Sequence, residues 1–274
     1  MLAAALLHAC WNALAKGRVG GDPFIGAVVI AIGAAVVSLA TLPFSGLPDP
    51  ASYPFVGASG IIHVGYFVLI GASYRHADFT AIYPLMRGAA PLVVAAFGLL
   101  LFQEALTLPL LAGTLFLSGG VIGLGAQSIR SGGLAAKGLA IAAVNIAIIV
   151  IYTLVDGYGV RRSGNPVGYV TLMMALTGAI LVGLIGCYRG RDLLRMLLRQ
   201  WHIGLVGGVM AMLSYGAALW AMTHAPIGAV AALRETSVLF ATMIGVVFLG
   251  ERLGLARLVA TLAIFAGLAC MRLS

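Results

Sequence analysis

The stretch MRGAAPLVVAAFGLLLFQEAL, residues 86–106, decides the fold, because LRETSVLFATMIGVVFLGERL, residues 233–253, repeats its pattern. In both stretches an arginine precedes a long apolar run, and a glutamate closes that run. The repeat superposes Arg87 on Arg234 at a spacing of 147 residues and superposes the two glutamates at the same spacing. The chain of 274 residues is therefore expected to be a duplication of a unit about half its length.

The composition excludes a soluble fold. Hydrophobic residues make up 62% of the chain and charged residues only 9%, whereas about one quarter of a soluble domain is charged. A helix needs ~20 apolar residues to cross the hydrocarbon core. Longer stretches without any charge separate Asp22 from Asp49, Asp49 from Arg75, Glu104 from Arg130, and Arg162 from Arg189. These features predict an all-α polytopic membrane protein.

Clusters of Gly, Pro and Asp divide the apolar runs into ten predicted transmembrane helices. A duplicated unit of five spans inserts its second copy upside down, because five is odd. The sequence thus predicts two inverted five-helix repeats, residues 1–130 and 131–274, with a binding site between them near the midplane of the membrane. The predicted spans are 2–16, 24–44, 54–74, 79–101, 107–127, 135–155, 167–187, 203–223, 227–249 and 255–272.

The net charge of +8 predicts contact with anionic lipid rather than nucleic acid, because the basic residues lie in short predicted loops. If the amino terminus is outside, eleven basic residues face the cytoplasm and three face outward, which favours both termini outside. Arg191, Arg195 and Arg199 among leucines predict an amphipathic helix on the membrane surface. The cysteines Cys10, Cys187 and Cys270 stand alone and do not support a disulfide framework. No nucleotide-binding loop is present, which disfavours ATP-driven transport. No metal or other cofactor is expected.

Three charged residues fall deep inside predicted spans and are the main candidates for a site. An arginine at the bilayer centre costs roughly 2.5–3.5 kcal/mol or more, and Arg87 and Arg234 each lie near the middle of a span. Glu235 points to another helix face than Arg234 and can pair with Arg87 across the bundle. The sequence leaves two interpretations open: an internal ion pair, or a substrate-binding or gating role with Glu235 as the proton-coupled group. Glu104 and Glu251 are expected to be structural carboxylates at span ends.

Residues around Arg87 predict a kinked helix. Pro91 removes the hydrogen bond to the carbonyl of Arg87, and Pro84 does the same four residues earlier. Gly88 allows close approach to the backbone, and Tyr83 is a further candidate on the same span. The freed carbonyl could meet an ammonium group while the Arg87 side chain meets an anion, although an ordinary kink is the competing interpretation.

The first span contributes polar side chains on one face. In HACWNALAK, residues 8–16, the residues His8, Trp11 and Asn12 share a helical stripe by their i, i+3 and i+4 spacing. Such a stripe is expected to face the bundle interior, because unpaired polar groups in hydrocarbon are costly. It serves either hydrogen bonding between helices or the wall of a cavity.

The motifs YPLMRGAAPL (83–92), FQEAL (102–106), LRETSVLF (233–240) and LGERL (249–253) resemble those of the EamA family of the drug/metabolite transporter superfamily. The HACWNALAK start is similar to the subgroup that opens with His-Ala-x-Trp-Asn. The resemblance covers the whole chain, but the first copy reads Phe102-Gln103-Glu104 where the second reads Gly250-Glu251-Arg252. It implies a ten-span carrier of small metabolites, often amino acids, in the bacterial inner membrane. Some similar proteins occur beside phosphonate-use operons.

Two alternatives come from other classes. Three short matches are typical of a rhomboid-type intramembrane serine protease: Gly57-Ala58-Ser59-Gly60, His8 with Asn12, and His202-Ile203-Gly204. Rhomboids, however, have six or seven spans without an inverted duplication. A non-transporting sensor or membrane subunit is the other alternative. The sequence favours a carrier, not an enzyme, that moves a small polar or anionic metabolite, amino acid-like or phosphonate-like, by alternating access; its substrate, direction, proton coupling and dimerisation stay open.

Overall fold

The fold is helical throughout the part of the chain that the computed structural model describes, residues 1–17, 23–76, 79–105, 107–130, 136–240, 243 and 255–272. Within these residues no strand occurs, which confirms the all-helical prediction. The elements are α1 (Leu2–Gly17), α2 (Pro23–Ser45), a 3-10 turn η1 (Pro50–Ser52), α3 (Tyr53–His76), α4 (Phe79–Phe102), α5 (Leu108–Arg130), α6 (Ala136–Arg162), α7 (Pro166–Met222), α8 (Ile227–Arg234) and α10 (Leu255–Met271).

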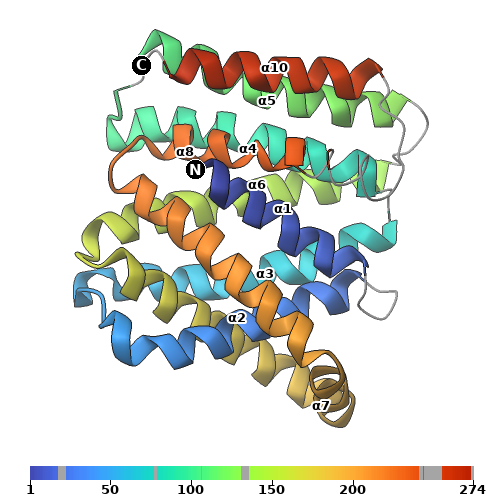
Figure 1. The fold of residues 1–274 in the computed structure, drawn as a ribbon, viewed down its shortest axis with the longest axis vertical. Coiled ribbons are helices and arrows are strands. Elements are labelled where there is room, and N and C mark those ends of the chain that lie inside the picture. Colours follow the sequence, from blue (N-terminus) through green and yellow to red (C-terminus); the bar gives the residue numbers. More distant parts are fainter. Residues whose placement is uncertain are drawn as a thin grey trace. The chain divides into compact units, whose positions relative to one another are not determined.

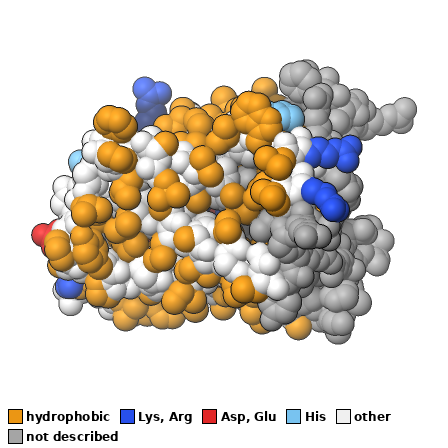
Figure 2. Space-filling view, turned by 90° about the horizontal axis from the view of Figure 1, so that it is seen from below, with side chains coloured by type: hydrophobic (Ala, Val, Ile, Leu, Met, Phe, Trp, Pro, Cys, Tyr) orange, Lys and Arg blue, Asp and Glu red, His pale blue; other side chains and the backbone are white. Residues whose placement is uncertain are grey.

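The helices have the length and the surface of membrane spans. Four described helical segments are long and apolar enough to cross a bilayer, and four shorter ones are also apolar. Large apolar side chains such as Phe44, Leu100 and Leu108 are 73–89% exposed. Figure 2 shows hydrophobic side chains spread over much of one face, with the coloured charged groups toward its edges. So large an exposed apolar surface fits lipid rather than water, as expected for a multi-pass membrane protein.

Most predicted boundaries agree with the structure to within three residues, namely those of α1 to α5 and α10. The exception among the first six helices is α6, which continues to Arg162 instead of ending near residue 155. The extension brings Asp156, which follows the predicted span of residues 135–155, inside α6, where it has no exposed surface. The helix stops where Gly164 takes a left-handed φ of 59° and Asn165 caps α7 by accepting from the Gly168 amide at 3.0 Å.

The predicted seventh and eighth spans form one continuous helix, α7, of 57 residues. Side chains added at Gly178 and Gly208 would both strike α2, the first at Ala35 and the second at Ala34. In a straight helix 30 residues would separate such points by ~45 Å, so α7 must fold back. Figure 1 shows this return, with α7 passing from olive to orange. We call residues 166–187 the first arm and residues 194–222 the second arm.

The fold-back region of α7 was expected to be a separate amphipathic helix. It is instead part of the same helix, and its exposed residues Leu194, Arg195, Leu198 and Arg199 precede Trp201, which is 62% exposed. On the inner side Met196 and Leu197 pack against Val28 and Ile32 of α2. The packing against α2 anchors the bend, while the arginines and Trp201 remain on the outer face.

The predicted ninth span, 227–249, is interrupted. Helix α8 ends at Arg234, Glu235 and Thr236 form a turn, and helix resumes at Ser237. The amides of Glu235, Thr236, Val238 and Leu239 each bond to the carbonyl three residues back, at 2.9–3.2 Å. The hydroxyl of Thr236 also donates to the Leu233 carbonyl at 2.7 Å, which offers that carbonyl a partner outside the α-helical pattern. The prediction of one unbroken helix here was wrong.

The chain divides into two compact units, each made from separate stretches of sequence. Unit 1 comprises residues 1–6, 72–154 and 224–274, and unit 2 comprises residues 7–71 and 155–223. In unit 1, α5 packs against α10, α4 and α8 around buried Leu117, Val121 and Ile264. In unit 2, α2 packs against α7. Each unit draws on both predicted repeats, so the compact units and the sequence duplication divide the chain differently.

A carboxylate just after the end of α4 caps the N-terminus of α8. Glu104 is 9% exposed, and its carboxylate oxygens accept from the Ile227 amide at 3.1 and 3.0 Å. Helix α8 has no side-chain cap of its own, because its N-cap residue is Pro226. A carboxylate at a helix N-terminus is favourable for both hydrogen bonding and the helix dipole. Glu104 is thus structural, as expected, and the helix that it caps is α8.

Gln103 adopts a left-handed backbone with φ of 51° at the end of α4. This conformation costs a non-glycine residue roughly 1–2 kcal/mol, and the second copy has Gly250 at the matching position. We expect Gln103→Gly to raise the free energy of unfolding by about 0.5–1 kcal/mol, since glycine's greater freedom when unfolded offsets part of the gain. Chemical unfolding in mild detergent measures it. Gln200→Gly, inside α7, should have the opposite sign.

Candidate functional site: a buried ion pair at a broken helix

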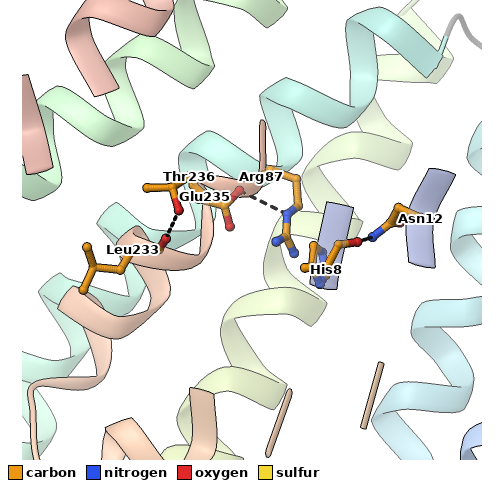
Figure 3. A network of polar contacts seen from close by, with 6 residues as sticks. All are labelled: His8, Asn12, Arg87, Leu233, Glu235 and Thr236. Carbon is orange, nitrogen blue, oxygen red and sulfur yellow. Dashed lines mark hydrogen bonds and ion pairs between the residues drawn. The ribbon is translucent and has the colours of Figure 1, made fainter. Parts of the chain in front are cut away.

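The three charges predicted to lie deep in the membrane meet in unit 1. Nε of Arg87, on α4, is 3.1 Å from Oε2 of Glu235, and the two side chains are only 3% and 5% exposed. Figure 3 shows the two side chains directed toward each other, with Glu235 on the turn that follows α8. The ion pair that the sequence left open is therefore present.

The break after α8 determines the position of the Glu235 side chain. Because the chain leaves the α-helical path at Glu235 and Thr236, the Glu235 carboxylate projects from a turn rather than from a regular helix face. The bond from the Thr236 hydroxyl to the Leu233 carbonyl, also drawn in Figure 3, supports the turn. A short 3-10 stretch within a helix often marks a functional hinge. The acidic partner of Arg87 thus lies at the break in the helix.

Arg234 lines the same cavity as the ion pair and is 7% exposed. The cavity measures about 10 Å³, on the order of what a single water molecule needs. Its other lining residues come from α4, α6 and α8: Ala90, Pro91, Val94, Ile149, Tyr152, Thr153 and Ala231. Most of the lining residues are apolar, and the charged ones among them are Arg87, Arg234 and Glu235.

Among the described residues that line this cavity, the cationic side chains outnumber the anionic ones. Two guanidinium groups, of Arg87 and Arg234, accompany one carboxylate, of Glu235. In a medium of low polarity an unbalanced charge interacts strongly with an ion of opposite sign. A planar guanidinium binds a carboxylate or phosphonate through two parallel hydrogen bonds. The lining therefore has the charge and the donors to attract an anionic group.

Of the residues expected to kink α4, Gly88 and Pro91 lie in the described part of the structure. Pro91 lies in α4 and lines the cavity, and its ring nitrogen carries no hydrogen for the Arg87 carbonyl. Gly88 makes its close approach to α5 rather than to the cavity, because a side chain there would lie 2.8 Å from the Ile122 amide nitrogen. Tyr83 and Pro84 belong to α4, but their side chains lie outside the described part of the structure.

The polar stripe of the first span lies in unit 2, not in the unit that contains the ion pair. His8 is 6% exposed and contacts Trp11 edge to face, with ring centroids 5.1 Å apart. The side-chain amide of Asn12 donates to the His8 carbonyl at 2.8 Å within the same helix. This bond lies within α1 and gives one N–H of the Asn12 amide a partner. A hydrogen bond to another helix is therefore not needed to account for that N–H.

Sequence reasoning missed a second buried acid, Asp156, whose carboxylate bonds to two tyrosines in unit 2. It also missed Thr153, which lines the ion-pair cavity from α6. A signal was available: Asp156 follows 18 uncharged residues and precedes Arg161 and Arg162 by more than one helical turn. Extending the sixth span to those arginines would have placed Asp156 inside the membrane.

A multi-pass helical membrane protein with ionisable groups buried among its spans belongs to a class in which such groups usually line a pathway. The model of the EamA-like transporter family matches residues 136–273, just over half of the chain. The chain belongs to this family, whose members transport small molecules across membranes. A protein known from a crystal structure shares the fold, with a TM-score of 0.71 and 21% identity over 99% of this chain and 97% of the other. No curated protein matches the sequence.

Proposed function

We propose that the chain is a secondary carrier for small anionic or zwitterionic metabolites, amino acid-like or phosphonate-like, in the bacterial inner membrane. The observation that carries the proposal is the buried Arg87–Glu235 pair beside Arg234, at a break in a span. A pair kept only for stability would be replaceable by apolar side chains. Burying a second arginine beside this pair adds a further desolvation cost, and a transport site gives that arginine a use.

The proposed binding step is an exchange of partners at Arg87. An incoming carboxylate or phosphonate takes the guanidinium from Glu235, and Arg234 contributes the second positive charge. Glu235, released from Arg87, is then the group that can accept a proton with the substrate. Pro91 leaves the Arg87 carbonyl as an acceptor for an ammonium group. Substrates with both an anion and an ammonium would thus find partners for both.

The conformational step follows from the size of the cavity. A space of about 10 Å³ holds no metabolite, so the site must open for binding. The turn at Glu235 and Thr236 is the hinge in this proposal, and loss of the Arg87–Glu235 bond frees it. Alternating access by two inverted five-helix repeats, with the binding site between them, would then expose the site to each side in turn.

Transport by purified protein in liposomes tests the proposal. Counterflow is measured with a panel of amino acids and phosphonates for the wild type, Arg87→Gln and Arg234→Gln, and for Arg199→Gln as a control on the exposed surface of α7. We expect each buried variant to lower kcat/KM by at least about 30-fold, corresponding to the ~2 kcal/mol or more that loss of a buried charged contact costs. The control should match the wild type.

Two results would contradict the proposal. If both buried variants transport at the wild-type rate with unchanged affinity, the arginines are not part of the binding site. If the wild type exchanges no member of the panel, the proposed substrate class is wrong.

A further inference from the structure

Exposed side chains form two neighbouring rows on the outer face of the bend in α7. In a helix, residues at positions i, i+4 and i+7 lie on one stripe. The apolar row consists of Leu194, Leu198 and Trp201, which are 58–67% exposed. The polar row lies one position further along the chain and consists of Arg195, Arg199 and His202, which are also exposed. The bend thus presents apolar and basic groups side by side.

The described part of the bend carries a positive charge. Residues 194–203 contain two arginines and no acidic residue, and α2, which packs against the inner side of the bend, has no charged residue in its 23 positions. Arg189, Arg191 and Asp192 belong to the same bend, but their side chains lie outside the described part of the structure. The two exposed arginines are four residues apart, so their Cβ atoms lie ~5–6 Å from each other. Both guanidinium groups can therefore bind the same phosphate group.

The length of the second arm indicates that this face lies at the membrane surface. The apolar segment Leu194–Met222 has 29 residues, about nine more than the ~20 that cross the hydrocarbon core. The arginines and Trp201 are at its amino end, where arginine avoids hydrocarbon and tryptophan favours the interface. Figure 1 shows the bend nearly end-on, where α7 passes from olive to orange, so the bend runs across the two arms. Such a segment lies along a membrane that the arms cross.

The two rows fit the two parts of a phospholipid. The apolar row offers a surface to an acyl chain, and the arginines beside it offer two cations to the phosphate group. A soluble anion would contact only the arginines and would leave the apolar row without a partner. A zwitterionic headgroup brings its own cation close to the arginines, whereas an anionic headgroup does not, and like charges repel. The surface therefore favours an anionic phospholipid.

We propose that Leu194, Arg195, Leu198, Arg199 and Trp201 form a binding site for one anionic phospholipid, with its phosphate on the arginines and an acyl chain along the apolar row. The site lies in unit 2, whereas the Arg87–Glu235 pair lies in unit 1. No step of the proposed transport uses this lipid, so Arg199→Gln remains the control in the counterflow experiment. Lipid binding is measured without a transported substrate, and failure of one proposal is distinguishable from failure of the other.

Native mass spectrometry of the full-length protein in mild detergent tests the site, with phosphatidylglycerol or phosphatidylcholine of the same acyl chains as the added lipid. We expect the wild type to bind one phosphatidylglycerol more tightly than any phosphatidylcholine. Arg195→Gln/Arg199→Gln should lower the affinity for phosphatidylglycerol about 30-fold, because each arginine near an anionic surface contributes a factor of about five. Arg272→Gln, at an exposed position after α10 in unit 1, is the matched control and should bind like the wild type.

Three results of this measurement would overturn the proposal. The first is equal affinity of the wild type for the two lipids, and the second is unchanged affinity for phosphatidylglycerol in the double variant. The third is displacement of phosphatidylglycerol by an equal concentration of inorganic phosphate, because the arginines would then bind the anion without help from the apolar row.

Tryptophan fluorescence locates the lipid and keeps the test decisive if the double arginine variant does not fold. Bromine atoms on an acyl chain quench a tryptophan that the chain contacts. In phosphatidylcholine vesicles with a minor share of brominated lipid, we expect brominated phosphatidylglycerol to quench more than brominated phosphatidylcholine. This excess should vanish in Trp201→Phe and persist in Trp220→Phe, the matched control, since Trp220 is 56% exposed on the same helix. An excess that survives in Trp201→Phe, or no excess in the wild type, would contradict the proposed site.

Discussion

Replacing Glu235 by leucine is expected to lower the free energy of unfolding by about 3–5 kcal/mol, the usual cost of removing one partner from a buried ion pair. The loss leaves Arg87 and Arg234 lining one small cavity without the Glu235 carboxylate. Replacing Arg87 by leucine should cost less, because Glu235 then keeps Arg234 as a neighbouring cation. The order of the two effects follows from the unequal number of charges at the site.

The double variant Arg87→Leu/Glu235→Leu separates the pair interaction from the burial of each side chain. If the two charges stabilise each other, the double variant is less destabilised than the sum of the single variants. Chemical unfolding in mild detergent provides the four free energies of this cycle. Arg199→Leu, at an exposed position of α7, should change stability by less than ~0.5 kcal/mol. Additive single effects would mean that the contact contributes no coupling.

The helices and the pair of interacting charges could be predicted from the sequence, because any other arrangement in a bilayer would cost a large free energy. Apolar runs of span length leave little choice of structure in a bilayer. Charges that fall inside such runs must find partners, and the one-residue step from Arg234 to Glu235 turns the carboxylate toward another helix. The prediction that Glu235 can pair with Arg87 was therefore confirmed.

The break after α8 and the length of α7 could not be predicted from the sequence in this way. A Thr-Ser pair inside a span is compatible with a regular helix, and only the observed bonds from Thr236 and the neighbouring amides show the turn. In α7 the segment 188–202 is polar enough to be a loop, yet packing of Met196 and Leu197 against α2 accompanies its helical conformation. A local change of hydrogen bonding accompanies the break after α8, and a tertiary contact accompanies the helical conformation in α7; hydrophobic periodicity predicts neither.

The small residues show a similar limit. Gly119 and Gly123 have the G-x-x-x-G spacing that is typical of helix packing, but no atom of the described residues lies within 4 Å of a side chain added at either position. The close contacts between α5 and α10 fall instead at Gly113, Gly120 and Gly267. Spacing alone does not tell which face of a glycine-rich helix meets another backbone, because several registers give the same pattern.

The contact between α2 and the second arm of α7 predicts the other large effect on stability. A methyl group at Gly33 would lie 1.9 Å from the carbonyl oxygen of Gly204, and this neighbour is backbone that no rotamer change can move. We expect Gly33→Ala to lower the free energy of unfolding by about 3 kcal/mol, at the upper end of the range for overpacking. The same chemical unfolding measurement applies.

Gly57→Ala is the matched control for this change, since Gly57 lies inside α3 of the same unit with nothing within 4 Å of the added methyl group. There the higher helix propensity of alanine should raise the free energy of unfolding by up to ~1 kcal/mol. Opposite signs for one substitution in one unit distinguish backbone contact from propensity. Equal effects would show that α2 does not approach the second arm so closely, and the fold-back of α7 against α2 would lose its main support.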